Sequence, residues 1–246
     1  MNRILMAALL TASAFNSQAA TPQINVGTMF DYMQANSTQL LKRVRNSGGA
    51  TAFVRVEISR MHFDASGEIT ETPVDAAALA RSEPGAQGLI ASPSRMIVPA
   101  NNGQQATRLV FRGNRDSEQY YRIRFVPVVP EKGEFSLTQE QSEEYKKSIS
   151  AGVNVFTGYG TMVFVAPTDA RYDTHADAHQ VRNQGNATVV LENLRQCAIA
   201  RPDNCSKGTR VHLFPGQAHI LNHAPEQFSR YQLIEGGATR EFDSRR

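Results

Sequence analysis

The sequence predicts an all-β protein made of two β-sandwich domains. Strand-like runs recur along the chain with turn residues between them, whereas helical signals are few. The uncharged stretch Ser148–Pro167 is longer than an average strand of about 5–6 residues, and it divides the chain into a larger and a smaller part. Seven short strand-like runs fall within the 76 residues (246 minus 170) after Ala170, which fits a small sandwich.

The first nineteen residues have the features of a cleaved export signal. Arg3 gives a short basic start, Ile4–Phe15 is mostly apolar, and Ser17–Ala19 fits the small-x-small cleavage pattern. The apolar run is too short to span a bilayer. We therefore expect cleavage near Ala19 and an exported mature chain of 227 residues (246 minus 19). No later stretch is long enough to cross a membrane, so membrane insertion is not expected.

Charge and cysteine content narrow the class of protein. Loss of Arg3 lowers the formal net charge from +3 to +2, and no block of five like charges occurs, which argues against nucleic acid as a partner. Two cysteines in an exported chain, Cys197 and Cys205, predict a local disulfide. A reactive or metal-binding pair is disfavoured, because no CxxC motif or nearby histidine accompanies them.

The first predicted domain spans residues 20–167. Leu40–Arg45 forms a strand that ends in the turn 46–49, and Thr51–Met61 alternates cleanly between its two faces. Three further strands are predicted at Arg95–Val98, Thr107–Phe111 and Tyr120–Val129. Residues 62–88 are expected to form a long loop with one helical turn near 76–80, and the charged segment 131–147 a long connection.

The first half of the uncharged stretch alternates, so one face of the expected strand carries an apolar row. This row, called the donor row below, consists of Ile149, Ala151, Val153 and Val155. The second half, Met162–Val165, is apolar on both faces and is predicted to lie in the core. An apolar row on a sheet edge is a template for a strand of another chain. Alternatively, the row packs on the protein's own core.

The second predicted domain spans residues 168–246, with the domain joint at 168–170. Its strands are expected at Tyr172–Thr174, His179–Arg182, Ala187–Gln196, Arg210–Phe214, Ala218–Leu221, Tyr231–Ile234 and Thr239–Phe242. A domain of this size has a marginal core, which gives a structural reason for the predicted disulfide.

No catalytic motif appears in the chain. The GxSxG elbow, the HExxH motif and the P-loop are all absent from the sequence. His175, Asp177 and His179 would share one face of an extended strand, with a spacing that a metal ion could use. The alternative, which we favour, is a solvated polar face. We therefore predict a protein without enzymatic activity, cofactor or metal.

One basic residue in the predicted strands is expected to point inward. Lys42 shares its face with Leu40 and Val44, so it must pair with another group or open into a cleft. Most other strand arginines, among them Arg45, Arg122 and Arg124, are expected on solvated sheet faces.

The chain resembles the periplasmic pilus-assembly (fimbrial) chaperones. The resemblance is to the alternate group that serves common-pilus and colonisation-factor fimbriae, within a PapD-like architecture, and it covers nearly the whole mature chain. The stretches that carry it are Asn25–Met33, Leu40–Ser47, Ser92–Pro99, Thr107–Leu109, Tyr120–Ile123, Gly160–Pro167, Asn183–Thr188, the cysteine pair and Leu213–Gly216.

The resemblance implies two immunoglobulin-like domains in an L or boomerang arrangement, with a cleft between them. It implies a periplasmic chaperone that donates a strand to pilus subunits, pilins or a tip adhesin, and delivers them to an outer-membrane usher. In the family, basic residues on the first and last strands of the first domain anchor the subunit's C-terminal carboxylate. Residues 22–34 and 148–166 contain no Lys or Arg. The anchor candidates are therefore Lys42 first, then Arg45, Arg122 and Arg124.

Two other functions remain open at this point. The chain could be an exported adhesive or structural fimbrial subunit with sandwich domains. It could also be a metal-dependent periplasmic enzyme that uses the His175 cluster.

Overall fold

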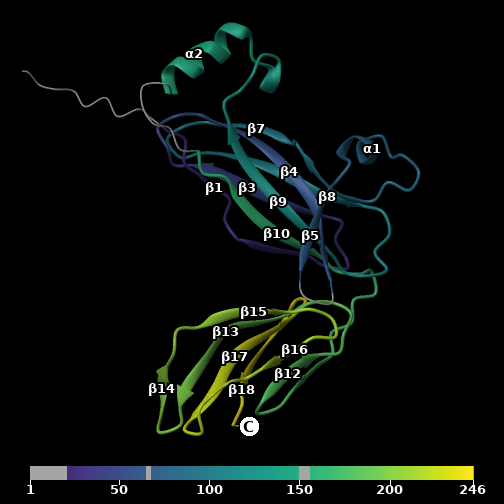
Figure 1. The fold of residues 1–246 in the computed structure, drawn as a ribbon, viewed down its shortest axis with the longest axis vertical. Helices are drawn as coiled ribbons and strands as arrows, with labels where there is room; N and C mark the ends of the chain where they lie inside the picture. Colours follow the sequence, from purple (N-terminus) through teal and green to yellow (C-terminus); the bar gives the residue numbers. More distant parts are fainter. Residues whose placement is uncertain (1–20, 65–67, 150–155, 246) are drawn as a thin grey trace, which may run out of the picture.

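The computed structural model describes residues 21–64, 68–149 and 156–245. These residues form two β-sandwiches arranged one above the other along the long axis of the molecule (Figure 1). The predicted all-β fold class is confirmed, and each sandwich contains two sheets. None of the helices in the described ranges has the length and hydropathy needed to cross a membrane.

The first sandwich packs a four-stranded sheet against a six-stranded sheet. The four-stranded sheet has the order β1 (Ile24–Asn25), β3 (Gln39–Asn46), β8 (Gly103–Arg112), β6 (Gly88–Ser92). The six-stranded sheet has the order β2 (Phe30–Met33), β10 (Tyr159–Val165), β9 (Gln119–Val128), β4 (Ala52–Phe63), β5 (Ile69–Pro73), and β7 (Arg95–Val98) also pairs with β4.

Strict alternation of side chains builds the core between these sheets. In β3, Lys42, Val44 and Asn46 are buried while their neighbours face solvent, and in β9 every second residue from Gln119 is buried. The alternation in the sequence predicted that the Lys42 side chain points inward, and its burial confirms this prediction. The alternation also decides which arginines stay outside, because Arg122 and Arg124 occupy the opposite face of β9.

Two α-helices and one short 3-10 helix accompany the first sandwich in the described residues. The predicted helical turn is α1 (Ala76–Ala80), which begins after Asp75, whose carboxylate accepts the backbone N–H groups of Ala77 and Ala78. The segment expected to be a plain connection contains the short 3-10 helix η1 (Glu134–Ser136) and helix α2 (Gln139–Ile149).

Helix α2 starts at a capping box that the sequence carries. The Gln141 backbone N–H donates to Thr138 Oγ1 at 3.2 Å, and the Gln141 side chain accepts the Thr138 N–H at 2.9 Å. Tyr145 fixes the helix on the sandwich, since its ring meets the Phe53 ring edge-on at 4.7 Å and its hydroxyl donates to the Thr51 carbonyl at 2.8 Å.

Several strands were not predicted. β5 falls in the expected loop 62–88, β6 begins at the end of that loop, and β1, β2 and β14 are also additional. β5 pairs antiparallel with the end of β4, which extends to Phe63. These strands are short or charged, so pairing with distant neighbours, and not local pattern, determines them. Strand β10 begins at Tyr159, later than the expected start of the long strand.

The second sandwich contains a three-stranded and a five-stranded sheet. The first has the order β11 (Thr174–Ala176), β12 (Gln180–Asn183), β16 (Ala218–Ile220). The second has the order β14 (Arg201–Cys205), β13 (Val189–Ala198), β17 (Gln227–Glu235), β18 (Ala238–Asp243), with β15 (Thr209–Leu213) also on β13. The core between them includes Val181, Leu191, Tyr231 and Leu233.

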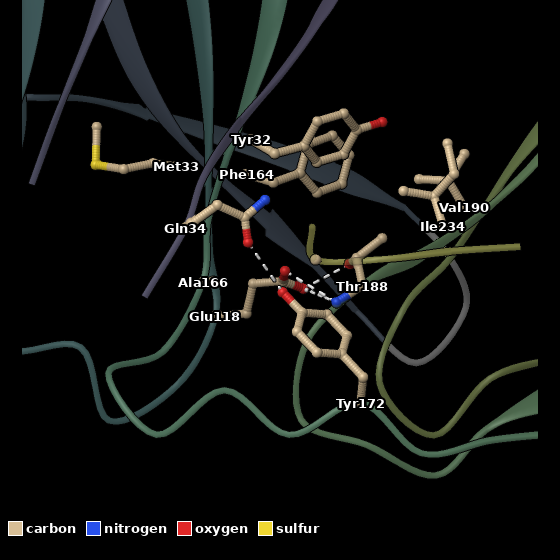
Figure 2. A pocket seen from close by; sticks show the side chains of 11 residues that line it. Tyr32, Met33, Gln34, Glu118, Phe164, Ala166, Tyr172, Thr188, Val190 and Ile234 are labelled. Atoms are coloured by element: carbon tan, nitrogen blue, oxygen red, sulfur yellow. Dashed lines mark hydrogen bonds between the residues drawn. The ribbon is translucent and has the colours of Figure 1, made fainter. Parts of the chain in front are cut away.

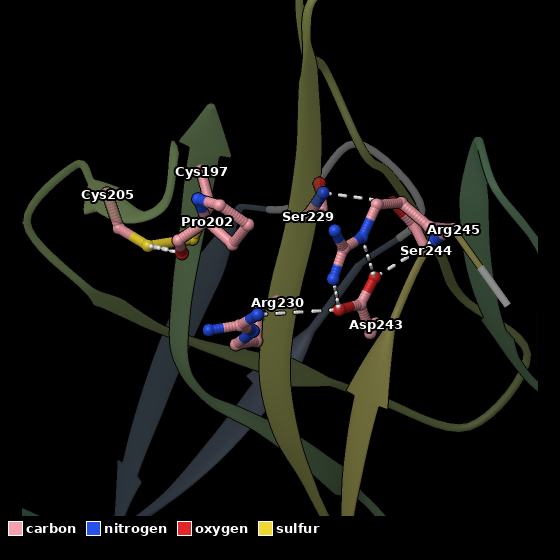
Figure 3. Close-up of polar contacts among 8 residues, drawn as sticks. All are labelled: Cys197, Pro202, Cys205, Ser229, Arg230, Asp243, Ser244 and Arg245. Carbon is pink, nitrogen blue, oxygen red and sulfur yellow. Dashed lines mark hydrogen bonds and ion pairs between the residues drawn. A yellow bond between two sulfur atoms is a disulfide. The ribbon is translucent and has the colours of Figure 1, made fainter. Parts of the chain in front are cut away.

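The predicted disulfide is confirmed. Cys197 and Cys205 are directly paired residues of β13 and β14, with their Cα atoms 4.0 Å apart (Figure 3). On the same sheet, Asp243 accepts from Arg245 at 2.6 Å and lies 3.5 Å from Arg230, and these contacts lower the pKa of Asp243 to about 2. The disulfide and this ion pair thus tie both outer strands of the sheet to its centre.

Candidate functional site

Aromatic rings from both sandwiches meet at the domain joint. Tyr32 lies on β2 and Phe164 on β10, where the strand register places them side by side. His212 of β15 stacks on Phe164 with ring centroids 5.0 Å apart, and its Nε2 is 2.7 Å from the Tyr32 hydroxyl oxygen. Phe214, the residue after β15 (Thr209–Leu213), also stacks on Phe164, with ring centroids 6.2 Å apart. The joint is therefore packed by Tyr32 and Phe164 of the first sandwich against His212 and Phe214 of the second.

Burial keeps this cluster uncharged near neutral pH. It lowers the pKa of His212 to about 4, with the Arg210 guanidinium as a second cause, and it raises the pKa of Tyr32 to about 12. A neutral imidazole can accept a hydrogen bond from the Tyr32 hydroxyl at Nε2.

A carboxylate forms a second link across the joint. Glu118, just before β9, accepts the Thr188 backbone N–H at 2.9 and 3.0 Å and the Thr188 hydroxyl at 2.5 Å, as Figure 2 shows. The Tyr120 hydroxyl donates to the same carboxylate at 2.7 Å. Desolvation raises the pKa of Glu118, and these hydrogen bonds oppose that rise.

One edge of β10 is incompletely paired. β9 pairs with β10 over its whole length, whereas β2 runs parallel to it only along Met162–Val165. The last bond on the β2 side joins the Met162 N–H to the Met29 carbonyl at 2.8 Å. Because alternate residues of a strand direct their backbone N–H and C=O groups to the same edge, those of Gly160 point to the β2 side, like those of Met162. On that side, no strand in the described part of the chain pairs with Tyr159–Thr161. Such an edge can accept a strand from another chain.

Two arginines lie one strand inward of this open edge, on β9. Arg122 is opposite Met162 and Arg124 is opposite Gly160, both on the outer face of the six-stranded sheet. Glu71 of β5 holds them, with Oε1 at 3.2 Å from Arg122 Nε and Oε2 at 2.7 Å from an Arg124 terminal nitrogen. The bond from Arg124 is the main cause that lowers the pKa of Glu71.

Glycines leave space over these arginines. A surface hollow is lined by Glu71, Arg122, Arg124, Phe125, Val126, Gly158, Tyr159 and Gly160. A Cβ atom on residue 160 would lie 3.5 Å from Arg122 Cδ, so any side chain there would occupy part of the hollow. The hollow therefore combines a strand edge with two cations, which suits an extended peptide that ends in a carboxylate.

The other anchor candidates lie elsewhere. Lys42 is 3% exposed, and its Nζ donates to Asp31 at 2.6 Å and to the carbonyl and hydroxyl of Thr28 at 2.5 and 3.3 Å. All three protons of the ammonium group are therefore occupied, and an external carboxylate would have to displace Asp31. Arg45 donates to Asn102 at 3.0 Å on the outer face of the four-stranded sheet.

The donor row is only partly within the described residues. Ile149 is the last residue of helix α2 and is 5% exposed, so the expected strand at this position is wrong in this conformation. The capping box at Thr138 favours a helix through this segment, which the uncharged pattern after residue 148 did not indicate. Ala151, Val153 and Val155 lie outside the described residues.

The shared strand face that a metal ion could have used, the alternative not favoured from the sequence, does not form. β11 ends at Ala176 and β12 starts at Gln180, so His175, Asp177 and His179 do not share one strand. Asp177 accepts the backbone N–H groups of His179 at 2.7 Å and Gln180 at 2.9 Å, which makes the turn and lowers the pKa of Asp177. Within the described ranges, no three His, Cys, Asp or Glu side chains are placed to hold a metal ion.

The chain is similar in sequence to fimbrial chaperones along most of its length. No family model matches it. It is 24% identical over 215 residues to a protein named "Probable fimbrial chaperone EcpB" from Escherichia coli O18:K1:H7 (strain IHE3034 / ExPEC), a match that covers 86% of each chain. The protein of the same name from Escherichia coli O157:H7 (strain EC4115 / EHEC) is 24% identical over 218 residues, covering 87% of this chain and 86% of the relative.

Solved structures show the same fold. The crystal structure of the class 5 fimbriae chaperone CfaA is 17% identical, with a TM-score of 0.53 over 89% of this chain and 98% of that one. A chain from a chaperone–tip adhesin complex of CFA/I fimbriae biogenesis is 15% identical, with a TM-score of 0.50 over 90% and 98%. The two sandwiches are thus those of the two-domain immunoglobulin-like architecture.

Proposed function

We propose that this protein is a periplasmic chaperone that holds pilus subunits by lending them a β-strand and passes them to an outer-membrane usher. The observation that carries the proposal is the open edge of β10 beside Arg122 and Arg124. Sequence similarity to named fimbrial chaperones over 86% of the chain supports it. The tip adhesin in one similar structure suggests adhesins as well as pilins as partners. The role needs no catalytic group, cofactor or metal.

In this proposal the subunit extends the six-stranded sheet at Tyr159–Thr161. Main-chain hydrogen bonds supply part of the affinity, and alternate apolar side chains supply the rest. Ile149, Val153 and Val155 would each contribute about 1.5–3 kcal/mol when buried in a subunit groove. Because Ile149 now ends helix α2, donation requires the last turn of α2 to open.

The subunit's C-terminal carboxylate would bind Arg122 and Arg124. Two guanidinium groups already hold one carboxylate there, that of Glu71, at 2.7 and 3.2 Å. An incoming carboxylate can replace it with little loss, because the donors and the space over Gly160 are in place. Lys42 remains a second candidate, although its pairing with Asp31 makes that exchange harder.

Export and domain organisation complete the proposal. The first nineteen residues act as a cleaved signal that sends the chain to the periplasm, where Cys197 and Cys205 can form their disulfide. Residues 20–167 form the domain that holds the subunit, and residues 168–246 form the second domain. The two alternatives, an adhesive fimbrial subunit and a metal-dependent enzyme, gain no support from the similar proteins or from the described histidines.

Amide hydrogen exchange of the free and subunit-bound protein tests the proposal. The Gly160 N–H points to the open edge, so it should exchange quickly in the free protein and slowly when a co-expressed pilus subunit is bound. The Met162 N–H is a matched control two residues away, because it is already bonded to Met29 and should be protected in both states. Equal exchange of Gly160 in both states would contradict strand addition at this edge.

A further inference from the structure

The outer face of the four-stranded sheet carries charge of a single sign. None of the strands β1, β3, β8 and β6 contains Asp or Glu. Arg43 and Arg45 of β3 and Arg108 and Arg112 of β8 are all exposed on this face, which we call the arginine face. The other sheet differs, since its Arg122 and Arg124 are paired with Glu71.

The strand register brings these arginines together around an apolar centre. Leu41 is directly opposite Arg108 and Arg43 is opposite Ala106, so Arg43 and Arg108 are diagonal neighbours about 7–8 Å apart. Leu41 is 51% exposed between them. Half-buried Val110 of β8 is paired with half-buried Ile90 of the next strand, β6. Lys42, one residue from Leu41, points inward to Asp31 and adds no outward charge.

Two of the arginines are held at the rim and two are free. Arg45 donates to Asn102 at 3.0 Å, and Arg112 donates to the Leu79 carbonyl at 2.9 Å. The side chains of Arg43 and Arg108 form no hydrogen bond or ion pair with any residue that the structure describes. The free pair can therefore meet an external anion without giving up an internal partner.

We propose that the arginine face docks on an anionic phospholipid bilayer, with guanidinium groups on headgroup phosphates and Leu41 inserted between them. A basic ring around an exposed aliphatic side chain is typical of peripheral membrane contact. The strands of this face offer no carboxylate to the basic groups of a partner, so electrostatic complementarity requires a partner that is itself anionic. Each basic residue near such a surface strengthens binding about fivefold, so four arginines supply roughly several hundred-fold at low salt.

The arginine face is also compatible with the proposed function, on which it does not depend. It covers the side of the first sandwich opposite the six-stranded sheet, which contains the open edge of β10. A protein docked through the arginine face would therefore keep that edge accessible to a subunit.

Flotation with vesicles tests this inference. The full mature chain is mixed with vesicles of phosphatidylcholine alone or with one third phosphatidylglycerol, at about 0.05 M and about 0.5 M salt. The test variant is Arg43→Glu/Arg108→Glu, and its matched control is Arg182→Glu/Arg201→Glu, which makes the same charge change at exposed positions of the second sandwich. Thermal unfolding of each variant establishes that it is folded.

The expected result is binding to the phosphatidylglycerol vesicles at low salt and its loss at high salt. The test variant should bind at least about tenfold more weakly than the wild type, whereas the control pair should change binding less than about threefold. Leu41→Ser alone should weaken binding a few-fold, about the effect of one lost aliphatic contact.

Three results would overturn the inference. One is a wild-type chain that ignores both kinds of vesicle or binds them equally. The second is an equal loss of binding in both double variants, which would indicate a general effect of net charge. The third is retention of the wild type on immobilised polyglutamate through Arg43 and Arg108 without vesicle binding, which would assign the face to an acidic protein instead.

Discussion

Replacing Glu71 by glutamine should strengthen the capture of a subunit's C-terminal carboxylate. The Glu71 carboxylate now occupies Arg122 and Arg124, at 3.2 and 2.7 Å, where the incoming carboxylate is proposed to bind. A neutral amide no longer competes as an anion. Because the Arg122 and Arg124 side chains are 31% and 42% exposed, each ion pair contributes no more than about 1 kcal/mol. We therefore expect Glu71→Gln to cost about 1 kcal/mol of stability and to raise affinity by up to about tenfold.

The assay is a titration with two forms of one peptide that copies the last strand of a pilus subunit. One form ends in a free carboxylate and the other in an amide. Glu71→Gln should increase the affinity for the free acid and leave the amide unchanged. Glu241→Gln is a matched control, because Glu241 of β18 bonds only to Gln232 among the described residues and lies on the other sandwich.

Charge also predicts how this competition depends on pH. The arginines lower the pKa of Glu71, so it stays ionised and competes throughout the range in which the subunit carboxylate is ionised. The reasoning would be refuted by an unchanged or weaker affinity for the free acid in Glu71→Gln, or by an equal gain for the amide. Either result would move the anchor away from Arg122 and Arg124.

Three further predictions concern stability. Cys197→Ser with Cys205→Ser should lower the stability of the second sandwich by about 2–3 kcal/mol in calorimetry, and thiol titration of the oxidised, unfolded wild type should find no free thiol. The pKa of His212 is lowered in the folded protein to about 4 from about 6.5, so the unfolded chain binds more protons between these two pH values. The midpoint temperature of unfolding should therefore fall as the pH drops from about 6.5 to about 4, and His212→Phe should flatten this dependence. Lys42→Ala should destabilise the first sandwich by about 3–5 kcal/mol in denaturant unfolding, because it leaves Asp31 without its buried partner, and Lys42→Ala with Asp31→Asn should recover part of the loss.

Local patterns in the sequence predicted the faces of the strands well. The inward direction of Lys42 followed from its parity with Leu40 and Val44, and the structure has that parity. The disulfide followed from the cysteine count and the export signal. The first inference depends on the alternation of side chains along a strand, and the second depends on export to an oxidising compartment. Both features can be read from a single sequence.

The grouping of side chains in space could not be predicted in the same way. Glu71 reaches Arg122 and Arg124 only because β5 pairs with β4, and nothing local in a segment rich in Gly, Pro and acidic residues indicates that pairing. Register between distant strands is a tertiary property, so Lys42 ranked above the arginines although it is paired internally.

Two local signals were present but not used. Thr138 and Gln141 form a capping box that marks the start of helix α2, and it explains why Ile149 is helical. Asp177 followed closely by His179 and Gln180 is a turn signal, since an aspartate often accepts backbone N–H groups two and three residues on. The first signal opposes the strand that was expected at Ile149, and the second opposes the extended segment that a metal site at His175, Asp177 and His179 would have needed.

The most direct test of strand donation is the substitution Val153→Asp in the donor row, measured by co-purification with a tagged, co-expressed pilus subunit. Ile220→Asp is the matched control, because Ile220 is an exposed aliphatic side chain of the second sandwich. The account predicts that both variants unfold within a few degrees of the wild type and that only Val153→Asp loses the subunit. A Val153→Asp protein that still holds the subunit, or whose first sandwich unfolds because the row belongs to its own core, would contradict it.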